Sequence, residues 1–327
     1  MPQRLQSLNE WLAGPVGLRE FDIQPASGDA SFRRYFRVTL PDGATHIAMD
    51  APPDKEDSRP FVQLARRLRE IGLNAPAIHH EDLANGFLLL DDFGTTHYLD
   101  ALNGDTAERL YGDALSALMA LQACGPVEGI PSYDEALLMR EMELFRDWLA
   151  QKHLGLELSE REQRMLDDAF GALVSSAMEQ PRVCVHRDYH SRNLLVTPSP
   201  SPGILDFQDA VLGPVTYDLV SLLRDCYIRW PLEQVETWAR GYFELAVQSG
   251  VLRLEHEPRF IRWFDLMGIQ RHLKAAGIFA RLNHRDGKPG YLKDIPRTLG
   301  YICEVGPRYA EMEGLVAFIK GRVLPNL

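Results

Sequence analysis

The stretch Val183–Val196, Val-Cys-Val-His-Arg-Asp-Tyr-His-Ser-Arg-Asn-Leu-Leu-Val, decides how the rest of the chain is interpreted. An apolar run leads into a polar loop with His186 and Asp188, and Asn193 follows that Asp by five residues. A second apolar run, a turn rich in Pro and Ser, and a third apolar run that ends at Asp206 come next. The pattern predicts strand, polar loop, strand, turn and strand, which together present two carboxylates and one amide.

These side chains are the ones that phosphoryl transfer from a nucleotide requires. An Asp orients the attacking hydroxyl, and an Asn and a second Asp hold magnesium between phosphate oxygens. The spacing is typical of the kinase catalytic loop and the Asp-Phe pair that follows it. We therefore expect Asp188 to be the catalytic base, with His186 in the catalytic site to steady the loop. Asn193 and Asp206 are expected to bind Mg²⁺, and ATP is the expected phosphoryl donor.

A second His-Arg-Asp tripeptide, residues 284–286, serves as an internal control. Tyr291 stands where the Asn would be required, and no apolar strand with Asp-Phe follows. Gly287 and Pro289 lie nearby, and both are frequent in turns. We therefore expect this copy to form a surface turn without a catalytic role.

Length and composition indicate an ordinary globular chain with two lobes or domains. The protein has 327 residues, of which 45% are hydrophobic and 25% are charged. No apolar run is long enough for a membrane span, and the N-terminal sequence does not resemble a signal peptide. The four cysteines are far apart, which favours a reducing cytoplasm, and Cys184 is expected to be a buried thiol. The net charge of −11 argues against a nucleic-acid partner.

Hydrophobic periodicity predicts an α+β chain. We expect residues 1–92 to form a small N-terminal lobe with a nucleotide-binding sheet, and residues 93–327 to form a larger, mostly helical C-terminal lobe. In the first lobe, strands are expected near residues 21–23, 35–40, 46–49 and 87–90, and helices near 3–13 and 57–71. In the second, helices are expected near 105–123, 133–151, 159–178, 216–228, 231–249, 257–283 and 296–320.

The segment Ser27–Val38 is a candidate phosphate loop, because Gly28 would let the backbone approach a phosphate. Ser31 and Arg33 are the other candidate nucleotide contacts in this loop. The segment contains a single glycine, whereas phosphate loops usually contain two or three, and a plain hairpin would look the same.

The strand near residues 46–49 lacks a residue that kinases normally have. Met49 stands where a Lys usually pairs with the α- and β-phosphates. Lys55, Arg33 or Arg34 could supply the positive charge instead. Asp91 and Phe93 follow the last expected strand of the first lobe, where a hinge would meet an adenine ring. Asp91 and Asp92 could alternatively cap the next helix.

Two further features concern the acceptor side of the site. Asp218, near the start of an apolar helix, could accept backbone donors of the catalytic loop, or it could be a first-turn carboxylate favoured by the helix dipole. Between residues 271 and 297 there are seven Lys or Arg against two Asp. Arg271, Lys274 and Arg281 share one helical face, which could be a solvated face or the edge of a pocket for an anionic group. We assign Asp209 to the acceptor site as well.

Residues His186–Asn193, Leu205–Asp209 and Gly213–Leu219 together resemble the aminoglycoside phosphotransferase and choline kinase superfamily. Within it, the stretches Met49–Pro53 and Gln270–Leu282 and the glycine segment at 28–35 look like the anomeric sugar kinases of bacterial cell-wall recycling. The resemblance covers nearly the whole chain and implies a two-lobed, protein-kinase-like fold. It also implies transfer of the ATP γ-phosphoryl group to the C1 hydroxyl of N-acetylmuramate and N-acetylglucosamine. A nucleotidyltransferase, linked by pathway rather than by binding, would then use the sugar 1-phosphate.

Other functions compete with this hypothesis. Another small-molecule kinase of the same fold would act on an aminoglycoside, choline or homoserine, and a cationic acceptor would favour an acidic pocket. A nucleotide-binding pseudokinase is suggested by Met49. A protein kinase is disfavoured because the chain between Asp206 and Gly213 leaves little room for an activation loop.

Overall fold

The computed structural model describes residues 2–28 and 32–327, so the candidate phosphate contact Ser31 lies outside the described residues. The chain forms two compact units. Unit 1 consists of Met1–His97 and Leu194–Asp209, and unit 2 of Tyr98–Asn193 and Ala210–Leu327. The boundary expected at residues 92 and 93 therefore falls inside unit 1. The segment with Asp206, which was expected in the second lobe, also belongs to unit 1.

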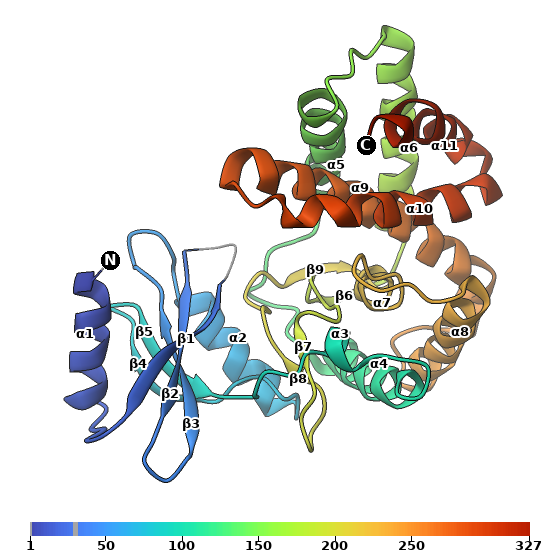
Figure 1. Ribbon diagram of the computed structural model, residues 1–327. Helices are drawn as coiled ribbons and strands as arrows, with labels where there is room; N and C mark the ends of the chain where they lie inside the picture. The colour runs from blue at the N-terminus through green and yellow to red at the C-terminus, as the bar shows by residue number, and fades with distance from the viewer. Residues whose placement is uncertain (1, 29–31) are drawn as a thin grey trace. The chain divides into compact units, whose positions relative to one another are not determined.

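Unit 1 is built on a five-stranded antiparallel sheet, as expected (Figure 1). The strand order is β1-β2-β3-β5-β4. The strands are β1 (Asp22–Gly28), β2 (Arg34–Thr39), β3 (Thr45–Asp50), β4 (Ile78–Asp82) and β5 (Phe87–Asp91). The sequence did not predict β4, which reads Ile-His-His-Glu-Asp. It lies at the edge of the sheet and is mostly exposed, so it lacks the apolar alternation by which strands are recognised.

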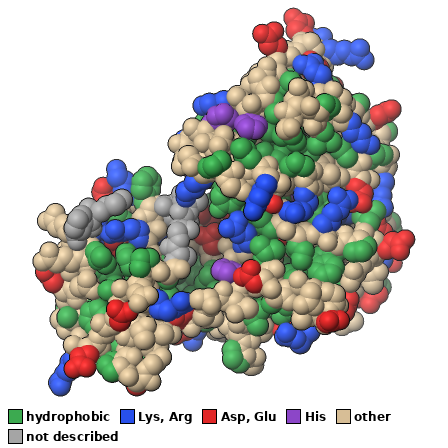
Figure 2. Space-filling model, viewed as in Figure 1, with side chains coloured by type: hydrophobic (Ala, Val, Ile, Leu, Met, Phe, Trp, Pro, Cys, Tyr) green, Lys and Arg blue, Asp and Glu red, His purple; other side chains and the backbone are tan. Residues whose placement is uncertain are grey.

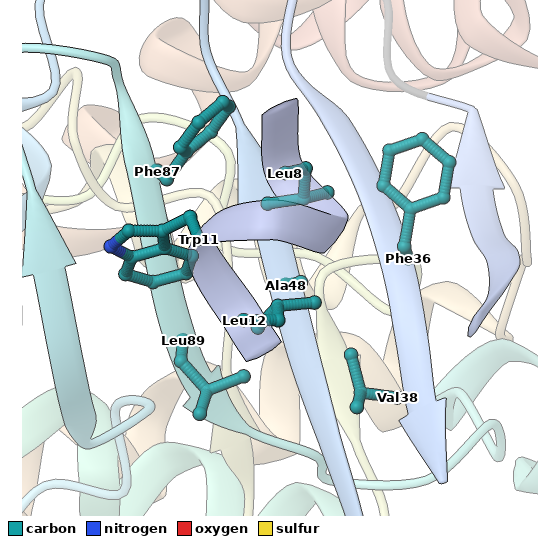
Figure 3. Packing of buried hydrophobic residues seen from close by; sticks show 8 residues of the cluster. All are labelled: Leu8, Trp11, Leu12, Phe36, Val38, Ala48, Phe87 and Leu89. Atoms are coloured by element: carbon teal, nitrogen blue, oxygen red, sulfur yellow. The ribbon is translucent and has the colours of Figure 1, made fainter. Parts of the chain in front are cut away.

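Helix α1 (Pro2–Ala13) covers one face of this sheet. Figure 3 shows Leu8, Trp11 and Leu12 of α1 directed at side chains of β2, β3 and β5. Leu8 and Leu12 are one turn apart and fully buried, so this face of α1 packs against the sheet. The sheet side of this core consists of Phe36, Val38, Ala48, Phe87 and Leu89.

The hairpin that precedes Asp206 joins unit 1 through specific contacts. Strands β7 (Leu194–Leu195) and β8 (Gly203–Ile204) form the hairpin. Asn74 accepts a bond from the N–H of Ile204 at 2.9 Å and donates to the carbonyl of Pro200 at 2.7 Å. Phe207 stacks on Phe61 of α2 (Arg59–Glu70), with ring centroids 4.9 Å apart. Because of these contacts, residues 194–209 belong to unit 1, and the two units are not two consecutive stretches of the chain as the sequence predicted.

Unit 2 is mostly helical and is arranged around the 30-residue helix α9 (Figure 1). Its strands β6 (Arg182–Val185) and β9 (Val211–Pro214) pair antiparallel. The other helices are α3 (Tyr98–Ala101), α4 (Ala107–Cys124), α5 (Glu135–Leu144), the π-helix η1 (Phe145–His153), α6 (Glu160–Met178), α7 (Tyr217–Leu223), α8 (Leu232–Gln248), α10 (Ile295–Val305) and α11 (Glu313–Phe318), with short 3₁₀ and π turns between or after some of them. No helix in the described part of the chain is both long and apolar enough to cross a membrane.

Helix α9 (Glu257–Asp286) corrects one expectation. The second His-Arg-Asp tripeptide was expected in a surface turn, but residues 284–286 form the last turn of α9. The helix ends at Gly287, whose φ of +64° is the left-handed conformation that glycine adopts at helix C-termini. The turn signal of Gly287 was therefore correct, but it marks the residue after the tripeptide.

Gly277 allows α9 to approach α5 closely. A Cβ atom at this position would lie 2.3 Å from the carbonyl carbon of Leu144, where α5 passes into η1. Gly277→Ala should therefore push the two helices apart, at a cost of about 1–3 kcal/mol in the free energy of unfolding. Urea denaturation would measure this cost.

Gly171 in α6 is the matched control, because a Cβ atom added at this position would have no neighbouring atom within 4 Å. Gly171→Ala should stabilise the protein by roughly 0.5–1 kcal/mol, because alanine is the better helix former. The two substitutions should therefore have opposite signs. Equal effects would contradict the close approach of α9 to α5.

Candidate active site

The candidate catalytic loop, residues 186–193, follows the buried strand β6 in unit 2. Cys184 within β6 is 1% exposed, so the buried thiol is confirmed. Arg187 has a φ of +78° and Asp206, in unit 1, has a φ of +61°. These are the two non-glycine residues with positive φ in the described part of the chain. Such strained backbone is frequent at functional sites and persists only where neighbouring contacts hold it.

Two buried carboxylates hold the loop at its two ends. Asp218 of α7 accepts bonds from the backbone N–H groups of His186 at 2.6 Å and Arg187 at 2.9 Å. This confirms that Asp218 supports the loop. Asp225 accepts from the N–H of Ser191 at 2.9 Å and from its hydroxyl at 2.5 Å.

Asp225 was not among the residues predicted from the sequence, although the sequence contains a signal for it. Asp225 follows Asp218 by seven residues, or about two helical turns, within the helix expected near 216–228. Two acidic residues about two turns apart in a mostly apolar segment would have indicated a shared polar partner. The helix α7 is shorter than expected and ends at Leu223, so Asp225 lies just beyond it. Asp218 and Asp225 are 0% and 1% exposed.

The loop folds around the backbone of Asp188. The carbonyl of Asp188 accepts bonds from the side-chain amide of Asn193 at 2.9 Å and from the N–H of His190 at 3.1 Å. The Nδ1 atom of His186 accepts from the N–H of Asp188 at 3.3 Å, and the His186 side chain is buried. His186 thus lies where it can steady the loop, and Asn193 lies directly beside Asp188.

Asp188 lies among positive charges. Burial alone would raise the pKa of its carboxyl, but Lys274, Arg271 and Arg187 together bring that pKa well below its usual range. Burial lowers the pKa of His190 to about 4. At neutral pH the loop therefore presents an ionised carboxylate and a neutral imidazole.

The basic face expected on α9 is buried in part. Arg271 and Lys274 are 5% and 6% exposed, which excludes a solvated face for these two residues. Lys274 contacts Glu141 of α5 at 3.3 Å and donates to the hydroxyl of Tyr217 at 2.9 Å. Arg281, farther along α9, is partly buried. Figure 2 shows Lys and Arg side chains gathered on the visible face of unit 2, around α9 and α10.

Arg271 has weak hydrogen bonding for a buried cation. Its Nη1 atom lies 3.6 Å from the Sγ atom of Cys226. Its Nε atom is buried and has no hydrogen-bond partner among the described residues. A buried guanidinium with unused donors is suited to bind an anionic group.

Unit 1 contains a pocket of about 260 Å³ at the position of the missing Lys. Its lining consists of Arg33, Met49, Glu56, Asp57, Ser58, Pro60, Phe61, Gln208 and Asp209. The sequence did not favour Arg33 over Lys55 as the cation that replaces the missing Lys. In the structure, Arg33 lines this pocket beside Met49. The Lys55 side chain is 55% exposed and lies 3.8 Å from Asp54. Gly28 ends β1, opposite Arg34 of β2.

The substrate residues assigned from sequence divide between the two units. Asp209 belongs to unit 1 and lines its pocket, whereas Arg271, Lys274 and Arg281 belong to unit 2. Asp209 shares the lining of this pocket with Arg33.

The expected hinge residues have defined places in unit 1. Asp91 ends β5, and its carboxylate accepts from the N–H of Ala77 at 2.9 Å and contacts Nε2 of His79 at 2.7 Å. The carboxylate of Asp92 accepts from Arg37 and from the N–H of Gly94. Neither carboxylate caps α3, which begins at Tyr98, so that alternative is wrong. Phe93 packs against Gly203, where an added Cβ would come within 2.7 Å of its ring. Contact of Asp91 and Phe93 with an adenine ring stays a prediction.

The two candidate magnesium ligands fit a hard cation in type. Asp206 offers a carboxylate, one oxygen of which accepts from Gln208 at 2.7 Å. Asn193 uses its amide nitrogen to bond Asp188, which turns its amide oxygen away from that carbonyl. Among residues 2–28 and 32–327, no three His, Cys, Asp or Glu side chains gather as a metal cage. Mg²⁺ in phosphoryl-transfer sites is held by one or two carboxylates plus substrate phosphates, so the donor set is appropriate.

Asp218 predicts a pH dependence of stability. Burial raises the pKa of its carboxyl from 3.8 to about 6, although its hydrogen bonds favour the charged form. From about pH 4 to pH 6, the folded protein therefore retains a proton that the unfolded chain has released. The free energy of unfolding should fall as pH rises through this window, by roughly 3 kcal/mol. Below about pH 4 both states are protonated and this effect ends.

Asp218→Asn cannot titrate, so its unfolding free energy should lack this decline relative to the wild type. Urea denaturation at a series of pH values between about 4 and 7 would measure the difference between the two proteins. Parallel curves for the two proteins would show that Asp218 does not titrate in this range.

Comparison with known proteins gives matches of three kinds. The model of the phosphotransferase enzyme family matches residues 22–257. An N-acetylmuramate/N-acetylglucosamine kinase of Pseudomonas putida is 46% identical over 314 residues, which cover 94% of this chain and 90% of that protein. A kinase of the same name from Neisseria meningitidis is 42% identical and covers 97% of this chain and 95% of that protein. An ADP-bound aminoglycoside phosphotransferase of known structure has a TM-score of 0.57 at 15% identity, and covers 90% of this chain and 97% of that one.

These matches confirm the resemblance and the two-lobed, protein-kinase-like fold. They also confirm that the protein is an enzyme of the kinase type. A family match that extends over most of the chain is independent of the loop geometry, and both lead to the same class of chemistry. The chain belongs to the phosphotransferase enzyme family.

Proposed function

We propose that this protein is an ATP-dependent kinase that phosphorylates the C1 hydroxyl of N-acetylmuramate and N-acetylglucosamine. The observation that carries the proposal is the 46% identity, over 94% of the chain, to a kinase named for these two sugars. The arrangement of the 186–193 loop supports phosphoryl transfer, because it presents an ionised Asp188 on a backbone held by Asp218 and Asp225.

In the proposed reaction, Asp188 accepts a hydrogen bond from the C1 hydroxyl and takes its proton as the hydroxyl oxygen attacks the γ-phosphorus. The bond between the γ-phosphorus and the β,γ-bridging oxygen breaks at the same time, and ADP leaves with the electron pair of that bond. An anomeric hydroxyl is more acidic than an ordinary alcohol, so the base has less to do here than in most kinases. Asp188 acts chiefly by orienting the hydroxyl, and it accepts the proton as the transfer proceeds. Asn193 and Asp206 would hold Mg²⁺, which supplies positive charge to the phosphate oxygens when bound. His186 would keep the N–H of Asp188 in place through the bond to its Nδ1 atom.

The nucleotide is proposed to bind through unit 1. Arg33, in the pocket beside Met49, is our first candidate for the cation that replaces the missing Lys, ahead of the exposed Lys55. Gly28 and Ser31 are proposed to contact the phosphates, and the Asp91–Phe93 segment to contact the adenine ring. ADP is bound in a structural relative, which supports ATP as the donor.

The acceptor is proposed to bind through unit 2. N-acetylmuramate differs from N-acetylglucosamine by a lactyl carboxylate, and the unused donors of Arg271 suit that group. Arg281 would contribute long-range positive charge. Lys274 is already bonded to Glu141 and Tyr217, so we place it near Asp188 rather than on the lactyl group. Asp209 stays a candidate for acceptor hydroxyls.

The setting of this reaction is proposed to be the cytoplasm, where ATP and recovered wall sugars would meet. The product would be a sugar 1-phosphate, and a nucleotidyltransferase would convert it to a UDP-sugar for peptidoglycan synthesis. This link requires no binding between the two enzymes. The proposal also requires no nucleic-acid or membrane partner.

The test is a coupled assay for ADP production with magnesium and a panel of acceptors. The panel contains N-acetylmuramate, N-acetylglucosamine, its 1-O-methyl glycoside, kanamycin, choline and homoserine. Turnover on both free sugars and none on the blocked glycoside would support C1 phosphorylation. Turnover on the blocked glycoside would overturn the C1 assignment.

Two alternatives remain as outcomes of the same panel. Turnover only on kanamycin, choline or homoserine would keep the phosphotransferase chemistry and reject the sugar assignment. No turnover with any acceptor, together with measurable ATP binding, would favour a pseudokinase.

A further inference from the structure

Glu141 is a buried carboxylate that no step of the proposed reaction uses. It lies on α5, and its side chain is 7% exposed. Its Oε1 atom is 2.5 Å from an Nη atom of Arg187 and 3.3 Å from the Nζ atom of Lys274. Its Oε2 atom accepts a hydrogen bond from the hydroxyl of Tyr133. One carboxylate therefore binds two cations and one phenol.

Two tyrosines complete this arrangement, which we call the Glu141 cluster: Tyr133, Glu141, Arg187, Tyr217 and Lys274. Lys274 donates to the hydroxyl of Tyr217 at 2.9 Å and lies over its ring, and Arg187 lies over the ring of Tyr133. The two rings meet edge to face, with centroids 5.2 Å apart. The cluster thus ties the segment before α5, α5, the catalytic loop, α7 and α9 together.

The close helix approach at Gly277 explains why Glu141 and Lys274 meet. Gly277 faces the backbone of Leu144. Lys274 lies about one turn before Gly277 on α9, and Glu141 lies about one turn before Leu144 on α5. The two charged side chains therefore project into the space beside the contact that glycine permits.

The cluster borders the catalytic carboxylate. Arg187 is the residue directly before Asp188, and its left-handed backbone is one of the two strained non-glycine positions in the described chain. Lys274 is the first of the positive charges that favour the ionised form of Asp188. Glu141 thus contacts both the residue that shapes the loop and the residue that sets the charge around Asp188.

We propose that Glu141 is a positioning residue for phosphoryl transfer, which holds the Lys274 ammonium beside Asp188 and fixes Arg187 within the loop. The inference rests on the proposed kinase chemistry at Asp188, but not on the identity of the acceptor.

The charge state of Lys274 depends on all the groups that face it. Burial lowers the pKa of its ammonium, Glu141, Tyr217 and Asp188 raise it, and Arg187 lowers it. The net effect is a raised pKa, so Lys274 stays charged across the neutral range. Glu141 is the largest of the opposing causes, so its neutralisation should move the pKa of Lys274 downward.

The test is Glu141→Gln, which keeps the shape of the side chain and removes its charge. We expect kcat to fall by roughly ten- to a hundredfold with KM little changed, because a misplaced catalytic group costs rate rather than substrate binding. We also expect the alkaline limb of the kcat–pH profile to shift to lower pH in the variant, because Lys274 would lose its proton at a lower pH than in the wild type. A purely structural role for Glu141 would not move this limb of the profile.

Glu143, on the same helix, is the matched control. It lies near the surface and contacts Arg146 at 3.3 Å, outside the cluster. Glu143→Gln should leave kcat and its pH profile unchanged.

A second variant separates positioning from failure to fold. Lys274→Met removes the cation, and Glu141→Gln should have little further effect on kcat in that background if Glu141 acts through Lys274. Glu141→Gln alone leaves two buried cations, Arg187 and Lys274, without their shared carboxylate. The double variant leaves only Arg187 without it, so the double variant should be the more stable of the two.

The outcomes distinguish this inference from the proposed function. Wild-type protein without turnover on any acceptor would overturn the function itself. Active wild-type protein and a folded Glu141→Gln variant with wild-type kcat and pH profile would overturn the positioning role alone. Additive losses in the double variant would show that Glu141 does not act through Lys274.

Discussion

Replacing Asp188 by Asn is expected to lower kcat by about 10²- to 10⁴-fold. The amide keeps the size of the side chain but cannot take the proton of the acceptor hydroxyl. The loop backbone should survive, because its bonds to residue 188 use the main-chain N–H and carbonyl. The loss should therefore appear in kcat, measured in the coupled assay at saturating ATP and sugar.

The chain contains its own control for this substitution. Asp286 ends a second His-Arg-Asp tripeptide, at the end of α9, and pairs with Arg285. Asp286→Asn should leave kcat at the wild-type value. If Asp188→Asn retained half of wild-type turnover, or if the two variants behaved alike, the assignment of Asp188 as the base would be rejected.

Neutralising Asp188 should also change stability. Arg187, Arg271 and Lys274 would lose one of the carboxylates around them, and Glu141 would be left to balance Arg187 and Lys274. We expect the variant to unfold at lower urea concentration than the wild type, with native-like spectra before the transition. The loss of rate should exceed what this change in stability can explain.

The parts that sequence predicted well are those whose signal is local. The catalytic loop was recognised because His186, Asp188 and Asn193 lie within eight residues of one another and follow an apolar strand. Asp218 was identified as a possible support because it is a carboxylate near the start of an apolar helix, and the alternative was a first-turn carboxylate favoured by the helix dipole. The strands β2, β3 and β5 were found from their apolar content, whereas the polar edge strand β4 was not.

The parts that sequence missed depend on contacts between distant segments. Glu141 is separated from Lys274 by more than a hundred residues, and nothing near it in sequence distinguishes it from Glu143. The return of the Asp206 hairpin to unit 1 depends on Asn74, which is an ordinary polar residue after a helix until Pro200 and Ile204 are placed beside it. Hydrophobic periodicity describes which face of an element is buried, but not which element covers it.

The choice between alternatives also required the fold. Arg271 and Lys274 have the spacing of a helical face, and the sequence alone allowed a solvated face or a pocket edge. Their burial beside Asp188 removes the first possibility. Likewise, the sequence did not distinguish Arg33 from Lys55 as the cation that replaces the missing Lys. The structure favours Arg33, because Arg33 lines the pocket and the side chain of Lys55 is exposed to solvent.

Replacing Asp206 by Ala is expected to have the larger effect of the two catalytic substitutions, with turnover reduced by more than about 10⁴-fold. The transition state of phosphoryl transfer spreads negative charge over phosphate oxygens, and the carboxylate that would hold Mg²⁺ is lost. Asn193 would remain as the other proposed ligand. The measurement is kcat as a function of magnesium concentration, and high magnesium should restore little activity.

The left-handed backbone of Asp206 makes a sharper design possible. With a φ of +61°, alanine at this position would be strained by roughly 1–2 kcal/mol, whereas glycine would not be. Asp206→Gly therefore removes the carboxylate without backbone strain, and should be more stable than Asp206→Ala but equally inactive. If Asp206→Gly regained substantial turnover, the loss in Asp206→Ala would be due to the backbone, and Asp206 would not be a magnesium ligand. Equal inactivity at unequal stability would leave loss of the carboxylate as the common cause.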